Sequence, residues 1–143
     1  MESIHPYLIF SGNCEEAFEF YAQVFGTQIG FSTRYKDGPM EVSSEFKDKI
    51  MHMSMSIGEA TLMGSDNCII PSKQEEGLLV GNNVHLSVSY GQEISQSMIS
   101  ERFQKLAVGG TVKMPLQNTF WGSYFGMLVD KYGVHWMFSQ EHH

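Results

Sequence analysis

One order of predicted elements occurs twice along this chain, and that repeat constrains the fold more than any other feature. Hydrophobic patterning in residues 5–66 predicts a strand, a helix and three further strands. The same order of elements can be followed again in residues 83–139. A period of roughly 75 residues indicates one supersecondary unit used twice. The sequence therefore predicts a single domain with module one at about 1–66, a linker at about 67–81 and module two at about 82–140.

The first module is marked by an amphipathic helix and an alternating strand. Apolar residues recur at helical spacing over Glu15–Phe25, after the expected capping residue Asn13 and before Gly26, which is expected to end the helix. Over Ile50–Ile57 (IMHMSMSI) the methionines alternate with His and Ser, as in a strand with one face in a core. The other predicted strands are His5–Phe10, Gln28–Tyr35 and Ala60–Gly64, and Met40–Lys49 is predicted to be a loop.

The second module repeats this plan. Ile94–Ala107 carries apolar residues on one side, as in a helix, and Gly109 and Gly110 follow it. A loop that holds Pro115 and Trp121 is expected between two of the strands. The predicted strands are Asn83–Tyr90, Thr111–Met114, Tyr124–Asp130 and Val134–Ser139.

Charge and composition exclude several function classes. The net charge is -7 and the nine basic residues are scattered, so no phosphate-binding surface and no nucleic-acid partner is expected. No apolar run reaches the ~18 residues of a membrane span, and no secretory signal is recognisable, so a cytoplasmic protein is expected. Cys14 and Cys68 are too few and too far apart for a disulfide framework or a zinc motif, and we interpret both as reduced thiols.

Four internal histidines are the candidates for a functional site. Strand alternation predicts that all four point away from the two helices, on the same side as Tyr7. The four are His5, His52, His85 and His135. Three interpretations remain open: hydrogen-bonded histidines that line a wet groove, polar contacts to an organic ligand, or an unorthodox metal site.

Three segments carry a family resemblance that covers nearly the whole chain. They are PYLIFSGNCEEAFEFYAQVFG, HMSMSIGEATLMGSD and GGTVKMPLQNTFWGSYFGMLVDKYGVHWMFS. Together they resemble the PhnB-like branch of the glyoxalase/bleomycin-resistance/dioxygenase superfamily, also called the vicinal oxygen chelate superfamily. The resemblance implies an α+β fold of two tandem βαβββ modules, whose curled mixed sheet surrounds a central cavity. Members also carry the label 3-demethylubiquinone methyltransferase, but no glycine-rich nucleotide loop follows a predicted strand here.

The same resemblance implies where a divalent metal would be bound. Superfamily enzymes take His or Gln from the first strand of each module and Glu or His from the last. The matching positions here are His5 and Asn83, and about Met63 and Met137. Thioethers are poor ligands for hard divalent ions, so the usual metal site is predicted to be lost and no cofactor is expected. A divalent metal remains possible, and His5 with His85 or His135 would then hold it.

Two functions follow from the resemblance, and the sequence leaves open whether the protein is an enzyme. The first is a metal-free module that binds a small molecule. The second is a metal-dependent lyase, thiol transferase or dioxygenase, in which the metal acts as a Lewis acid. No catalytic residue can be named, and the resemblance implies a homodimer. The predicted ligand-binding residues are His5, Tyr7, His52, Asn83, His85, Trp121 and His135.

Overall fold

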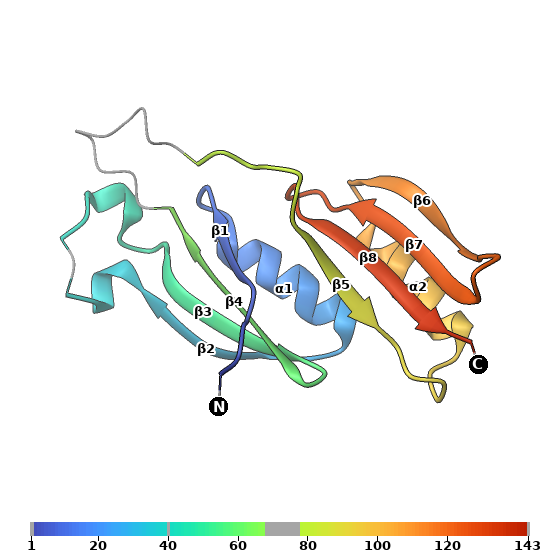
Figure 1. The fold of residues 1–143 in the computed structure, drawn as a ribbon. Coiled ribbons are helices and arrows are strands. Elements are labelled where there is room, and N and C mark those ends of the chain that lie inside the picture. The colour runs from blue at the N-terminus through green and yellow to red at the C-terminus, as the bar shows by residue number, and fades with distance from the viewer. Residues whose placement is uncertain (1, 40, 68–77, 143) are drawn as a thin grey trace. The chain divides into compact units, whose positions relative to one another are not determined.

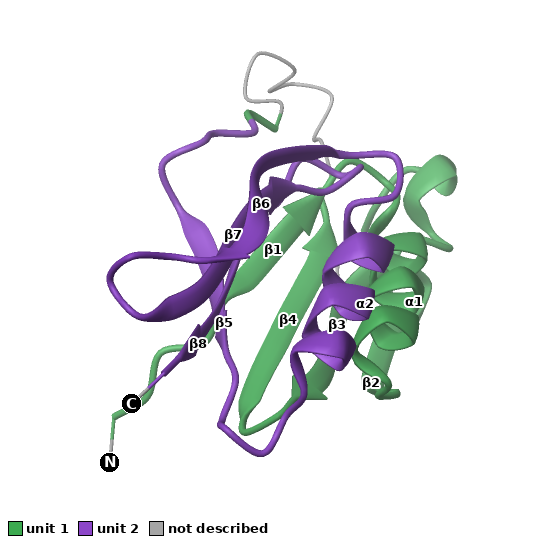
Figure 2. Ribbon diagram, turned by 90° about the vertical axis from the view of Figure 1, so that its right-hand side faces the viewer, with its two compact units in different colours: residues 1–79 green, residues 80–143 purple. Residues whose placement is uncertain are grey.

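The computed structural model describes residues 2–39, 41–67 and 78–142. The chain forms two compact units, Met1–Leu79 and Val80–His143, coloured separately in Figure 2. Most of the predicted linker, including Cys68, lies outside the described residues, as does Met40 of the predicted loop.

The first unit is a four-stranded mixed sheet with one α-helix (Figure 1). The strand order is β1-β4-β3-β2; β1 pairs with β4 in parallel, and the other pairs are antiparallel. Along the chain the elements are β1 (Tyr7–Phe10), α1 (Cys14–Phe25), β2 (Ile29–Arg34), the 3-10 helices η1 (Tyr35–Asp37) and η2 (Ser44–Phe46), β3 (Ile50–Ile57) and β4 (Ala60–Asp66). The predicted loop Met40–Lys49 thus contains one short helix.

Helix α1 packs its apolar side on this sheet, as the sequence predicts. The buried side of the helix includes Phe18, whose ring meets Phe10 edge-on at 6.3 Å between centroids. The sheet contributes Met53 and Met55, which are almost fully buried. A Cβ atom on Gly64 would lie 2.7 Å from the Phe18 ring, so only glycine lets the helix approach β4 this closely.

A buried carboxylate at the end of β4 fixes the start of α1, which corrects the predicted cap. Asn13 occupies the N-cap position, but its side chain makes no capping hydrogen bond. Instead Asp66, which is 2% exposed, accepts the Cys14 N–H through Oδ1 at 2.9 Å and the Ile50 N–H through Oδ2 at 2.8 Å. The Tyr35 hydroxyl donates to the Asp66 carbonyl oxygen at 2.7 Å. One side chain therefore ties together the ends of a helix and two strands.

The second unit repeats the topology of the first. Its strand order is β5-β8-β7-β6; β5 pairs with β8 in parallel, and the other pairs are antiparallel. Its elements are β5 (His85–Ser89), α2 (Gln96–Leu106), β6 (Thr111–Asn118), β7 (Ser123–Val129) and β8 (His135–Glu141). Two βαβββ units in tandem confirm the predicted α+β fold.

The core of the second unit lies between α2 and its sheet. Ser95 caps the helix by accepting the Met98 N–H at 3.1 Å. Phe103 from the helix meets Phe138 from β8 edge-on, at 5.5 Å between centroids. Trp136 is also buried, and its indole N–H donates to Asp130 Oδ2 at 2.9 Å.

The structure corrects several predicted strand boundaries, and those of β1, β5 and β6 matter most for the site. β6 does not end at Met114 but continues to Asn118, because Pro115 lies in an edge strand where its missing N–H is tolerated. β1 begins at Tyr7 and β5 at His85, so His5 and Asn83 each precede their strand by two residues. No helix among the described residues is long and apolar enough to cross a bilayer.

Candidate functional site

In the first unit, the sheet face without the helix carries an aromatic and polar row. The register places Tyr7 beside Met63, Met63 beside Ser54, and Ser54 beside Phe31, so one residue from each strand shares this face. Tyr7 is 44% exposed and Phe31 is 55% exposed. Both ends of the row are therefore open to a ligand.

His52 lies between these two aromatic rings. Its Nδ1 is 3.1 Å from the Tyr7 hydroxyl oxygen, and its ring centroid lies 5.6 Å from that of Tyr7 and 6.0 Å from that of Phe31. When the phenol donates to Nδ1, the neutral imidazole carries its proton on Nε2 and can donate it to a ligand. We call these three residues the first aromatic cluster.

In the second unit, two histidines stack on the corresponding face. His85 on β5 and His135 on β8 are direct neighbours in the parallel ladder. Their rings are 4.8 Å apart between centroids and inclined by 23°. His85 Nε2 lies 3.2 Å from the Asn82 carbonyl oxygen, which can only accept, so Nε2 carries the proton and the lone pair of the neutral ring is on Nδ1.

The structure brings four of the seven predicted site residues into these two groups, each within its own unit. His5 lies outside the strands, is exposed, and has Nε2 3.2 Å from the Ser3 hydroxyl. Asn83 is also exposed and precedes β5. Trp121 lies in the turn between β6 and β7, is 54% exposed, and meets Phe120 and Phe125 edge-on.

Phe31 was missed by the sequence analysis because the alternation of β2 is broken. Ile29 pairs with Met55, whereas Phe31 pairs with Ser54, so the register shifts at Gly30. Strict alternation places Phe31 on the same side as Ile29, but the bulge moves it to the open face. The glycine between two apolar residues is the signal that could have suggested a bulge.

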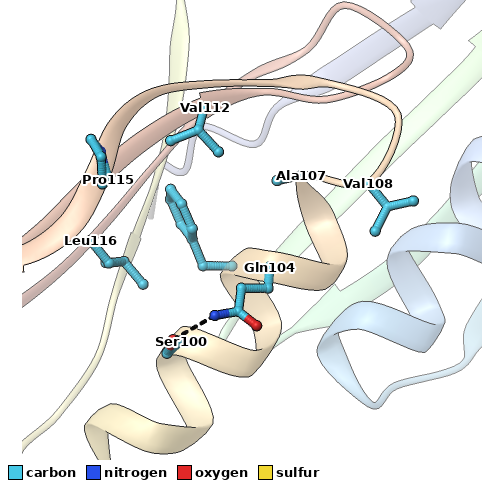
Figure 3. A pocket seen from close by; sticks show the side chains of 8 residues that line it. Ser100, Gln104, Ala107, Val108, Val112, Pro115 and Leu116 are labelled. Atoms are coloured by element: carbon cyan, nitrogen blue, oxygen red, sulfur yellow. Dashed lines mark hydrogen bonds between the residues drawn. The ribbon is translucent and has the colours of Figure 1, made fainter.

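A groove on the other face of the second sheet was not predicted. It has a volume of about 380 Å³ and lies between α2 and β6 (Figure 3). Its lining residues are Ser100, Phe103, Gln104, Ala107, Val108, Val112, Pro115 and Leu116. Gln104 Nε2 donates to the Ser100 hydroxyl at 3.3 Å, and no lining side chain is titratable, so the groove offers no acid, base or strong nucleophile.

The positions that hold metal in the wider superfamily do not suit a hard divalent ion here. Met63 lies beside Tyr7, and Met137 lies beside Ser87, so each unit offers a thioether next to a hydroxyl. Within the described ranges, no three His, Cys, Asp or Glu side chains gather closely enough to hold a metal. Hard divalent ions prefer carboxylate and carbonyl oxygens, and these residues do not provide them.

Cys14 is not a candidate nucleophile. The residue is fully buried. Burial, followed by the nearby charges of Asp66 and Glu15, raises the pKa of its thiol far above the ordinary value. A thiol held in its protonated form is a poor nucleophile.

Comparison with known proteins agrees with this architecture. The model of the family described as 3-demethylubiquinone-9 3-methyltransferase matches residues 2–139. Among curated proteins, YjdN from Escherichia coli K12 is 27% identical over 144 residues, covering 94% of this chain and 92% of that protein.

Solved structures extend the comparison. Protein PA1353 from Pseudomonas aeruginosa is 38% identical, with all of both chains covered and a TM-score of 0.78. The PhnB protein from Bacillus cereus is 27% identical over 97% of this chain and 99% of that one, with a TM-score of 0.76.

More distant structures share the fold alone. A glyoxalase/bleomycin resistance protein/dioxygenase family enzyme from Burkholderia phytofirmans is 16% identical over 94% of this chain and 96% of that one, with a TM-score of 0.62. FosX from Listeria monocytogenes, solved with Mn(II) and sulfate, is 11% identical over 98% of this chain and 93% of that one, with a TM-score of 0.60. The match over residues 2–139 shows that the chain belongs to the PhnB-like 3-demethylubiquinone-9 3-methyltransferase family, and its fold is that of the glyoxalase/bleomycin resistance/dioxygenase proteins.

Proposed function

We propose that this protein binds a small, partly apolar organic molecule on the helix-free face of its first sheet. The observation that carries the proposal is the Tyr7–His52 hydrogen bond beside the exposed Phe31 ring. It combines aromatic surface with a directed polar group, as ligand sites generally do. His85 and His135 supply a comparable polar group on the second sheet.

The first aromatic cluster favours a ligand with a ring and a hydrogen-bond acceptor. The exposed faces of Tyr7 and Phe31 can stack on a flat apolar group. The Nε2–H of His52 can donate to an oxygen of the ligand when Tyr7 donates to Nδ1. Tyr7 thus orients the imidazole for binding.

A metal-dependent lyase, thiol transferase or dioxygenase is the alternative. In that chemistry a divalent ion polarises the substrate oxygens and needs oxygen or imidazole ligands. Met63 and Met137 provide thioethers at the last-strand positions. The donor set therefore supports the binding function over the Lewis-acid enzyme.

Methyl transfer, the activity in the family description, is a separate hypothesis. It needs a site for a methyl donor beside the acceptor, and the sequence offers no glycine-rich nucleotide loop after a strand. Titration with S-adenosylmethionine tests it directly. Saturable binding of this donor would favour methyl transfer over simple binding.

Histidine NMR provides the test. We expect phenol, benzoate or indole, used as probes at millimolar concentration, to shift the imidazole Cε1–H resonance of His52. His142, which lies at the end of the chain beside Gln96 and Asn118, serves as an internal reference. Uniform shifts of all imidazoles, or no shift with any probe, would contradict the proposal.

Tyr7→Phe is the matched variant for the first cluster. It keeps the ring and removes only the hydroxyl that contacts His52. We expect it to weaken probe binding at His52 by roughly threefold to tenfold, which corresponds to the loss of one hydrogen bond of about 1 kcal/mol. Unchanged binding would show that the hydroxyl does not orient the imidazole.

A further inference from the structure

Three methionines form a row across the second sheet. Met114 on β6 pairs with Met127 on β7, which pairs with Met137 on β8. Neighbouring strands lie about 4.8 Å apart, so the three thioether side chains start from adjacent positions. Figure 1 shows β6, β7 and β8 side by side in this order.

This methionine row lies on the helix-free face. Its neighbours along the strands, Leu128, Trp136 and Phe138, are almost fully buried on the side of α2. Successive side chains alternate between the faces of a strand, so Met127 and Met137 point the other way. All three methionines are only partly buried, so they are not filler for the helix-covered core.

The stacked histidines occupy the next row on the same face. His135 precedes Met137 by two residues on β8, a separation of about 7 Å along the strand. The His85 ring is stacked on it at 4.8 Å. Methionine side chains are long and flexible enough to bring a sulfur to the imidazole edge.

The donor set matches one class of metal. Thioether sulfur selects soft ions such as Cu(I), and imidazole is compatible with copper. The row of His85 and His135 continues through Val129 to Thr111, and the methionine row ends at Ser87 on β5. Neither row contains a carboxylate that would bind a hard ion.

The His85 ring next to His135 has a defined tautomer. Its Nε2–H donates to the Asn82 carbonyl oxygen, which leaves the Nδ1 lone pair available. Metal-binding histidines usually hold their other ring nitrogen in this way. His85 therefore flanks the stacked His135 ring with Nδ1 as its free ring nitrogen.

We propose that the helix-free face of the second unit binds one soft monovalent cation, Cu(I), through the sulfurs of Met127 and Met137 and the imidazole of His135. Met114 and His85 flank these ligands. This site goes beyond the proposed organic-ligand function in two respects. It needs no organic ligand, and it binds a soft ion instead of the hard divalent ions that superfamily enzymes usually bind.

Competition with a chromophoric Cu(I) chelator, bathocuproine disulfonate, under anaerobic conditions tests the site. The full chain is used with Cys68→Ser, so that this thiol does not compete for the metal. We expect one equivalent of Cu(I) to be retained. The double variant Met127→Leu/Met137→Leu should lose affinity by at least about tenfold, and His135→Gln should lose affinity to a similar degree.

Met98→Leu is the matched control, because Met98 is 42% exposed on α2 in the same unit. Leucine conserves side-chain volume, and circular dichroism checks that each variant is folded. Equal affinity of the double variant and this control would overturn the proposal, as would the absence of a retained equivalent.

Ag(I), a redox-inert probe, locates the site. We expect it to shift the ε-methyl resonances of Met127 and Met137 but not that of Met98. Shifts confined to other methionines, or Zn(II) binding at the same residues with equal affinity, would overturn the assignment to a soft ion. Metal is added without organic ligand, so this result is independent of the probe-binding experiment above.

Discussion

Replacing Asp66 by alanine tests the account of how the first unit is held together. The carboxylate is 2% exposed and accepts the Cys14 and Ile50 N–H groups at 2.9 and 2.8 Å. Alanine leaves both buried donors without this acceptor. A buried unsatisfied group costs about 1–3 kcal/mol, so the two together should lower the free energy of unfolding by about 2–6 kcal/mol. That loss is large beside the ~5–15 kcal/mol of a typical domain.

Urea denaturation followed by circular dichroism measures this loss, and amide hydrogen exchange locates it. We expect the Cys14 and Ile50 amides to lose protection first. Asp66→Asn keeps one acceptor oxygen but turns an NH₂ group toward the other donor, so it should lose about half as much as alanine or more.

Asp48→Ala is the control, because its carboxylate is largely exposed and pairs only with surface groups. It should change stability by no more than about 0.5 kcal/mol. The reasoning would be refuted by an Asp66→Ala loss below about 1 kcal/mol, or by an asparagine variant as stable as the original chain.

Three further predictions concern packing, pH and assembly. Gly64→Ala should cost about 1–3 kcal/mol in urea denaturation, because the new Cβ would lie 2.7 Å from the Phe18 ring and 2.9 Å from the Leu8 carbonyl oxygen; a neutral result would show that α1 can shift. Burial raises the pKa of the Cys14 thiol in the folded chain, so above the ordinary pKa of 9.0 the thiol ionises first in the unfolded chain. The free energy of unfolding should therefore fall by up to about 1.4 kcal/mol for each pH unit above that value. Cys14→Ala should flatten this slope, and an unchanged slope would rule out the thiol as its source. We expect a homodimer, so sedimentation at micromolar concentration should give a species of twice the chain mass, and a single monomeric species would contradict this.

The elements with a clear period could be predicted from sequence. α1 begins one residue before the predicted helix, and β3 matches its prediction, because methionine and serine alternate through Ile50–Ile57. Elements with conflicting sequence signals were harder to predict. Pro115 suggested a loop, yet its place on an edge strand lets β6 continue.

The candidate site could be predicted only in part. Alternation correctly placed His52, His85 and His135 on the helix-free faces, because their neighbours are the apolar core residues. It could not predict that Tyr7 reaches His52, since that contact depends on the register of strands far apart in sequence. A bulge at Gly30 moved Phe31 to the open face, and although the glycine is a signal for a bulge, the strict alternation used for the other strands does not allow for one.

The parallel pairing of β1 with β4 has a consequence for synthesis. As the chain leaves the ribosome, α1 and the β3–β4 hairpin can form from nearby residues, but Phe10 must wait for Asp66 to emerge before the two can pair. The second unit has the same delay, because His85 needs His135. Such long-range closure slows folding. In each half of the chain, the first strand to be synthesised is therefore the last to pair. A nascent chain halted just before β4 or β8 would leave a strand edge unpaired and accessible to chaperones.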